Sequence, residues 1–133
     1  MATLEDNKRL ALDTWEALRR GDVKSAFANM RDDVTWRIPG MLPPVSGLKR
    51  GKEEILGFLR WAAATFPSGL QTEVKGVYGD GGIVVLELVN RSTAANGRPY
   101  ENEYCFVFEV EGGKIRAVRE YVDTQKVDAI VNR

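Results

Sequence analysis

The feature of this sequence that most constrains its fold is a pair of alternating stretches near the C-terminus, joined by a double glycine. Residues 104–110 are aromatic and β-branched, a composition typical of a pleated and largely buried strand. Gly112 and Gly113 supply the positive φ angles that a tight hairpin turn needs. Residues 114–123 then alternate again, so the sequence predicts a β-hairpin over 104–123.

The return arm of this hairpin contains the first candidate functional residue. In a strand every second side chain lies on the same face. Glu120 therefore shares one face with Val118 and Val122. A carboxylate between two valines is out of place on a purely structural face, and we interpret Glu120 as a site residue.

The rest of the chain predicts helices first and a meander afterwards. Apolar residues at helical spacing predict helices over 4–20, 22–30 and 52–66. Alternating or apolar runs predict strands over 33–38, 70–78, 83–92, 100–110 and 114–123, with a two-residue turn at Asn96-Gly97 and a short C-terminal helix over 124–131 capped by Asp123. The proline- and glycine-rich segment 41–51 is predicted to be a loop, either a lid or a plain connector.

These elements predict one α+β domain spanning residues 1–133. Helices on one face of a curved mixed or antiparallel sheet make a cone-shaped roll with an apolar interior. Such a shape either packs solid or keeps a pocket.

Composition excludes several classes of function. Nineteen basic and nineteen acidic residues balance, so nucleic acid and anionic membranes are not expected partners. The single Cys105 excludes an internal disulfide and, without an apolar leader or spanning segment, indicates a cytoplasmic protein. The chain has no histidine, which removes Ser-His and Cys-His catalysis and histidine-based metal sites. We expect no metal and no organic cofactor.

Four segments of the chain resemble the nuclear transport factor 2-like superfamily, which includes SnoaL-like polyketide cyclases, ketosteroid isomerases and limonene epoxide hydrolases. They are Trp-Glu-Ala-Leu-Arg-Arg-Gly-Asp at 15–22, Trp-Arg-Ile-Pro at 36–39, Gly-Gly-Lys-Ile at 112–115 and Arg-Glu-Tyr-Val-Asp at 119–123. The resemblance implies a pocket between helices and sheet, and a homodimer through the outer sheet face.

The catalytic residues of those relatives are mostly absent. Ile38 stands where ketosteroid isomerases have their general base. By resemblance to the epoxide hydrolases, Glu120 keeps one catalytic carboxylate. Trp36 and Ile38 replace their water-positioning pair. Glu87 and Val89 replace their Arg and Asp, or Leu86 and Leu88 do so if the strand is shifted by one residue.

With Glu120 placed inside the cone, alternation assigns the remaining inner side chains. The predicted wall is mostly apolar with a few polar groups, as small-molecule sites are. Its members are Trp15, Leu18, Trp36, Ile38, Val85, Glu87, Val89, Arg91, Asn102, Tyr104, Phe106, Phe108, Glu120 and Val122.

Three functions remain open. The first is an isomerase, cyclase, lyase or hydrolase acting on a small hydrophobic molecule, with Glu120 as acid–base group and Glu87 and Tyr104 assisting. Two carboxylates in an apolar pocket would share a proton. The second is a non-catalytic binding module for a small apolar ligand, which uses the same walls. In a purely structural interpretation, the two acids serve only in ion pairs with Arg91, Arg116 or Arg119. The third is a protein-interaction module that uses the outer sheet face. The apolar residues expected on that face also predict that it forms a homodimer interface; they are Leu86, Leu88, Cys105, Val107, Ala117 and Tyr121.

Overall fold

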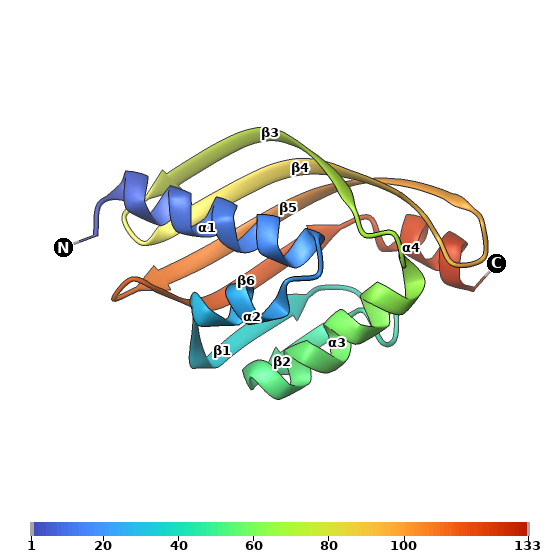
Figure 1. Ribbon diagram of the computed structural model, residues 1–133, viewed down its shortest axis with the longest axis horizontal. Coiled ribbons are helices and arrows are strands. Elements are labelled where there is room, and N and C mark those ends of the chain that lie inside the picture. Colours follow the sequence, from blue (N-terminus) through green and yellow to red (C-terminus); the bar gives the residue numbers. More distant parts are fainter. Residues whose placement is uncertain (1, 133) are drawn as a thin grey trace.

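The computed structural model describes residues 2–132 as helices packed on one curved sheet (Figure 1). The helices are α1 (Leu4–Arg19), α2 (Val23–Ala28), α3 (Gly51–Thr65) and α4 (Thr124–Val131). The strands are β1 (Met30–Ile38), β2 (Gly47–Arg50), β3 (Gln71–Asp80), β4 (Ile83–Thr93), β5 (Pro99–Glu111) and β6 (Lys114–Val122). The expected α+β class and every expected helix and strand are confirmed.

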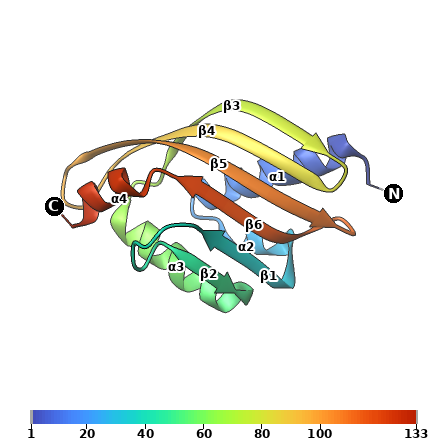
Figure 2. The same cartoon turned by 180° about the vertical axis from the view of Figure 1, so that it is seen from behind.

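The six strands form a mixed sheet in the order β2-β1-β6-β5-β4-β3. Only β1 and β6 pair in parallel, and all other neighbours are antiparallel. The sheet curves around α1, α2 and α3, which lie on its concave face, in front of it in Figure 1 and behind it in Figure 2. This arrangement leaves an interior between the helices and the concave face.

Local signals in the sequence account for the helix ends. Thr3 and Asp6 form a reciprocal capping box at the start of α1, with the Asp6 N–H donating to Thr3 Oγ1 at 3.1 Å. Gly21, at φ 84°, adopts the left-handed conformation just after α1. Asp123 caps α4 by accepting a hydrogen bond from the Gln125 N–H at 3.0 Å, as expected.

One strand was missed. Residues 47–50, which we expected to be part of a loop, form β2 and pair with residues 35–38 of β1 at the edge of the sheet. Four residues, the first of them a glycine, are too few to show a period, so the pairing with β1 decides their conformation. The strand turns Lys49 into the interior, where only 8% of this residue is exposed.

In β4 the inner and outer side chains are the reverse of our prediction. Leu86 lies directly opposite Phe106, so the even-numbered residues of β4 face the interior with those of β5. A two-residue turn at Asn96-Gly97 would have placed the odd-numbered residues of β4 opposite the even-numbered residues of β5. The Ala94 N–H instead bonds Arg98 O, which makes a loop of 95–97 with Gly97 at φ 84°. This shift of one residue turns every β4 side chain to the opposite face.

The even-numbered side chains of β4 and β5 form the centre of the core. Val84, Leu86, Phe106 and Phe108 are fully buried, and Trp36 of β1 packs its ring against Phe106, with centroids 6.1 Å apart. Complete burial of one such apolar side chain contributes about 2 kcal/mol to folding. Within the described residues, no helix combines the length and apolar character needed to cross a bilayer.

Candidate functional site

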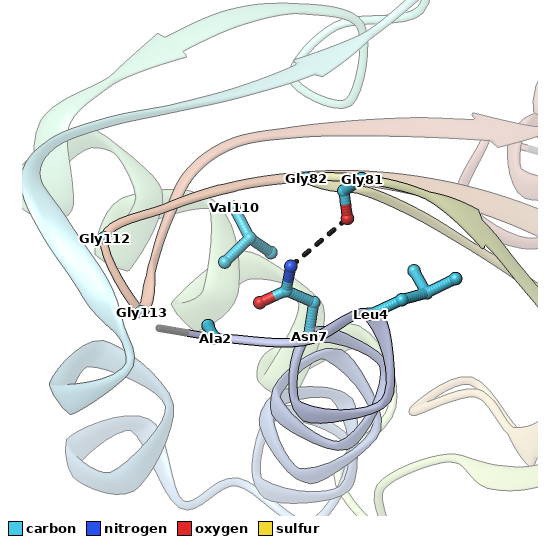
Figure 3. Close-up of a pocket in the computed structure, with 8 residues that line it drawn as sticks. All are labelled: Ala2, Leu4, Asn7, Gly81, Gly82, Val110, Gly112 and Gly113. Atoms are coloured by element: carbon cyan, nitrogen blue, oxygen red, sulfur yellow. Dashed lines mark hydrogen bonds between the residues drawn. The ribbon is translucent and has the colours of Figure 1, made fainter.

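Two hollows of the described structure differ in their chemistry, because only the second is lined by titratable side chains. The first, about 670 Å³, lies between the start of α1 and the β3–β4 and β5–β6 turns (Figure 3). Its wall is largely glycine backbone, and the Asn7 amide that points into it donates to Gly81 O at 3.2 Å. This hollow offers no acid, base or nucleophile.

The second hollow is an interior cavity of about 490 Å³ between the concave sheet face, the end of α1 and α3. Exposed residues of its wall, such as Arg20 and Arg60, mark its open end, while Tyr104 and Glu120 are buried. Aromatic side chains supply much of the lining: Trp15, Trp36, Phe58, Trp61, Phe66, Tyr100 and Tyr104. The cavity is thus an apolar space with a few polar groups, the usual form of a small-molecule site.

Glu120 is the only carboxylate among the described residues that line this cavity. It is 6% exposed and accepts a hydrogen bond at Oε1 from the indole N–H of Trp36, at 3.0 Å. Burial raises the pKa of Glu120 from 4.5 to about 7, against the opposing effects of the Trp36 hydrogen bond and the charge of Lys49. At neutral pH both the acid and the carboxylate are therefore populated.

Lys49 places a positive charge behind the cavity wall. Its ammonium donates to the backbone carbonyl of Val45 and lies 4.7 Å from the ring centre of Phe58. Burial lowers the pKa of Lys49, and the charge of Glu120 opposes that shift. Lys49 forms no direct ion pair with Glu120 within the described structure, so its influence on the acid acts at a distance.

Two tyrosines of β5 form a buried hydrogen-bonded pair at the cavity wall. The hydroxyl oxygens of Tyr100 and Tyr104 are 2.6 Å apart, and the Asn102 amide donates to the Tyr100 oxygen at 2.9 Å. Burial raises the pKa of Tyr100 to about 12 and the pKa of Tyr104 well above its ordinary value. Both phenols therefore stay protonated and can act as hydrogen-bond donors.

A second polar chain approaches the same region from the other side. The Trp15 indole N–H donates to Thr72 Oγ1 at 3.1 Å, and that hydroxyl donates to Asn90 Oδ1 at 2.6 Å. Asn90 is completely buried, and its Nδ2 has no hydrogen-bond partner within residues 2–132. A buried amide left without an acceptor is costly and calls for an explanation.

The structure brings part of the predicted wall together at the cavity. Trp15, Leu18, Trp36, Tyr104, Glu120 and Val122 line the cavity. Ile38, Asn102 and Phe106 are buried on the same inner face but stand outside the lining. These positions follow from the alternation of β1, β5 and β6.

Glu87, Val89, Val85 and Arg91 do not belong to the site, and their predicted inward placement is wrong. Glu87 is exposed on the outer face opposite Cys105, and Arg91 binds Glu101 and Glu73. The carboxyl of Glu87 interacts with the Tyr78 phenol and raises the pKa of that phenol. The expected proton-sharing pair of carboxylates is absent from the described cavity.

The structural ion pairs considered for Glu120 are also absent from the described residues. Arg116 and Arg119 both bind Glu109 on the outer face. The two arginines of β6 therefore bind a glutamate on the outer face, while the Glu120 carboxyl of the same strand faces the cavity.

Sequence reasoning missed Tyr100, Lys49 and the α3 side of the cavity. Tyr100 has the same parity on β5 as Tyr104, so extending the alternation by two positions would have found it. Lys49 had no local signal, because its strand is short. Phe58 and Trp61 lie on α3 and line the cavity. They could not be assigned from the sequence, because aromatic residues on such a helix are equally compatible with an ordinary core.

Comparison with known proteins supports the fold. An NTF2-like protein of unknown function from Burkholderia pseudomallei is 23% identical with a TM-score of 0.87, and the match covers 100% of both chains. An epoxide hydrolase from M. tuberculosis is 21% identical with a TM-score of 0.76, covering 96% of this chain and 90% of that one. TerC, co-crystallised with polyporic acid, is 19% identical with a TM-score of 0.86, covering 96% of this chain and 99% of that one.

Structures of this fold also include proteins described as a polyketide cyclase and an isomerase. No curated protein matches the sequence significantly. The model of the SnoaL-like domain matches residues 11–118, most of the chain. The protein therefore belongs to the SnoaL-like domain family, and it has the fold of the NTF2-like proteins.

Proposed function

We propose that this protein is an enzyme that moves protons on a small hydrophobic molecule held in the interior cavity, with Glu120 as the acid–base group. The observation that carries the proposal is a buried carboxyl that faces an apolar cavity, with a pKa of about 7. General acid–base catalysis works best when the catalytic pKa lies near the working pH. The reaction would be an isomerisation, a cyclisation or lyase step, or a hydrolysis, carried out without a cofactor.

The isolation of Glu120 supports this role. No second acid shares the described cavity, so burial alone holds the carboxyl partly protonated. The Trp36 N–H occupies one carboxyl oxygen and leaves the other for a ligand. A single carboxyl of this kind can take a proton from one position of a substrate and return it at another.

The shape and lining of the cavity support a hydrophobic substrate. Trp15, Trp36 and Phe58 form part of its wall, and polar groups are few. TerC, which shares the fold, was co-crystallised with polyporic acid. The family contains several enzyme classes on this one fold, so the reaction depends on the site and not on the architecture.

A non-catalytic ligand-binding module is the second candidate. The presence of only one carboxyl in the described cavity wall favours it, because many acid–base enzymes use two groups. The two candidates share the same cavity and differ only in turnover.

The deciding experiment compares the wild type with Glu120→Gln and with the control Glu87→Gln, whose carboxyl is exposed on the outer face. Terpenoid, steroid and aromatic compounds that raise the melting temperature of the wild type would be incubated with each protein and analysed by mass spectrometry and NMR. We expect conversion by the wild type and Glu87→Gln, and a loss of about 100-fold or more in Glu120→Gln. Ligand binding without conversion by the wild type would favour the binding module, and equal conversion by Glu120→Gln would end the proposed role of Glu120.

We also propose a homodimer through the outer face of β4, β5 and β6. Part of the face expected from the sequence is wrong, because Leu86 and Leu88 point inward. Cys105 and Val107 lie on this face as half-buried residues, next to a 41% exposed Tyr121. Val85, which was expected to face inward, lies opposite Val107 on the same face. A stable dimer would bury on the order of 1,500 Å². Light scattering at micromolar concentration should give twice the mass of the chain, and a monomer would contradict the proposal.

A further inference from the structure

The open end of the interior cavity is lined by cations. Its wall includes Arg60 on α3, and Arg19 and Arg20 at the end of α1. Glu120, the one carboxylate among the described residues of the wall, is buried away from this end. A ligand that enters the cavity therefore meets positive charge at the mouth and an apolar wall behind it.

The position of Arg60 on α3 places it at the mouth. Residues three and four positions apart lie on the same face of a helix. Leu56, Arg60 and Ala63 have this spacing, and all three line the cavity. Arg60 and Ala63 are exposed, while Leu56 is half-buried. This stripe of α3 therefore forms one side of the mouth, where the apolar lining gives way to solvent.

The two arginines at the end of α1 already bind acids. Arg19 Nε donates to Glu16 Oε2 at 2.6 Å, and a second guanidinium nitrogen binds the other oxygen of the same carboxylate. Arg20 is held less closely, by Asp22 at 3.4 Å and by Glu16 at 3.9 Å. Their positive charges are therefore largely balanced within the protein.

Arg60 is the cation of the mouth that lacks such a partner. It makes no hydrogen bond and no ion pair within residues 2–132. Its own helix offers it no acid, because the side chains three and four positions away are all apolar or absent: Leu56, Gly57, Ala63 and Ala64. A guanidinium presents several N–H donors in one plane, a geometry that matches a carboxylate. Arg60 thus leaves an unused anion-binding group at the entrance of an apolar cavity.

We propose that the mouth of the cavity binds an anionic group of the ligand, such as a carboxylate, which pairs with Arg60 while the hydrophobic body of the ligand lies inside. This inference rests on the proposed ligand cavity and names the class of ligand, a hydrophobic acid. Arg20, with its long contacts to Asp22 and Glu16, is the second cation at the mouth.

The reverse orientation of such a ligand is unfavourable. An anionic group carried to the buried end would lose its hydration and would lie near Glu120, which is itself partly ionised at neutral pH. At the mouth the same group stays in contact with water and gains the charge of Arg60. A ligand with an ammonium group at the mouth would instead meet a like charge. The charge of the mouth therefore fixes which end of the ligand enters first.

The test compares ligands that share a hydrophobic body and differ in charge. The anionic fluorophore 1-anilinonaphthalene-8-sulfonate and the neutral N-phenyl-1-naphthylamine have the same ring system, and their binding is measured directly by fluorescence. Decanoate and 2-naphthylacetate, each paired with its methyl ester, are measured by displacement of the neutral fluorophore.

Three variants separate the charge of Arg60 from its packing. Arg60→Met keeps an apolar stem on α3 and removes the charge, and Arg60→Glu reverses the charge. Arg9→Met is the matched control. Arg9 is an exposed arginine of α1 that also lacks an ion pair within the described residues, and it stands outside the cavity wall.

We expect Arg60→Met to weaken binding of the anions about fivefold, as one exposed ion pair would, and Arg60→Glu to weaken it further. The neutral partners should bind all proteins equally. The loss should largely disappear at about 1 M salt, because salt screens exposed charges. Arg9→Met should change neither class of ligand. The inference is overturned if the anions lose no more affinity than their neutral partners in Arg60→Met, if Arg9→Met causes the same loss, or if the wild type binds none of the anions.

This outcome is separable from the proposed catalysis. Glu120→Gln should keep the same dependence of anion binding on Arg60, because the charge at the mouth remains. An anion-specific loss in Arg60→Met without turnover of any compound by the wild type would support the mouth site and reject the enzyme. Turnover that requires Glu120, together with equal anion binding by the wild type and Arg60→Met, would do the reverse.

Discussion

The two faces of the β5–β6 hairpin shift the pKa of a glutamate carboxyl in opposite directions. Glu120 faces the interior, where burial raises its pKa to about 7 and no described cation bonds it. Glu109 faces outward, where a hydrogen bond from Arg119, supported by Arg116, holds its pKa below the ordinary value. The difference teaches that the face of the sheet, and not the residue type, decides whether a glutamate here is a structural anion or a proton carrier.

The two faces of β4 also differ, here in how deeply their side chains are buried. Its even positions from Val84 to Asn90 are buried, and its odd positions are exposed or only partly covered, except for Val89. Both faces of this strand are largely apolar in sequence, so the contrast appears only when β5 is paired with it. Three predictions, each comparing two substitutions, test the comparison, and the smallest effect comes last.

The largest effect is expected from exchanging a core side chain on β4. Leu86→Ala removes a fully buried side chain and should lower the free energy of unfolding by about 3 kcal/mol, because a cavity remains in the core. Val85→Ala, on the opposite face, should cost less than about 1 kcal/mol. Chemical denaturation measures both. Equal losses would mean that the two faces do not differ, or that a dimer covers Val85.

The second prediction concerns the two glutamates. Above pH 4.5 the unfolded chain releases the Glu120 proton, while the folded chain keeps it until about pH 7, so the stability contributed by this proton is lost as pH rises through that window. At pH 8 Glu120→Gln should therefore be more stable than the wild type by about 3 kcal/mol, and at pH 4 the two should be nearly equal.

Glu109→Gln should behave in the opposite sense. Its lowered pKa stabilises the fold above the ordinary pKa of a glutamate, and this contribution is lost on acidification. The variant should lose about 1 kcal/mol at pH 8, as expected for a partly exposed ion-pair cluster. Melting curves from pH 4 to 8 give both differences. A loss of stability at pH 8 in Glu120→Gln would show that its charge is compensated in the folded protein.

The third and smallest prediction concerns Lys49. Lys49→Met removes the positive charge that lowers the pKa of Glu120, so that pKa should move further upward. NMR of the Glu120 side-chain carboxyl across the pH range would show a higher midpoint. Lys75→Met is the control, because Lys75 pairs with Glu73 on the exposed surface and should leave the midpoint unchanged. An unchanged midpoint in Lys49→Met would mean that burial alone sets the pKa.

Much of the fold and part of the site could be predicted from short-range patterns. Thr3 and Asp6 mark the start of α1, and the alternation around Glu120 places that residue inside. Tyr104 and Trp36 were placed at the cavity wall by the same alternation. These predictions succeeded because each depends on residues within one helix or strand.

The position of Glu87 could not be predicted in this way. Its strand is apolar on both faces, so the pattern within 83–92 cannot say which face is buried. The loop at 95–97 decides it, and a change of one residue in loop length reverses the answer. Lys49 shows the same limit, since its strand exists only through pairing with β1.

The sequence by itself determined the order of the elements, their caps and the inward position of Glu120, because local periodicity and turn chemistry act over a few residues. Only the tertiary structure decided that Glu120 is the one carboxylate among the described residues of its cavity, that Lys49 lies behind the wall, and that the Asn90 amide is buried with no hydrogen-bond partner within residues 2–132. The physical reason is that burial and hydrogen-bond satisfaction depend on groups brought together from distant strands. The proton affinity of the site is therefore a property of the folded sheet as a whole.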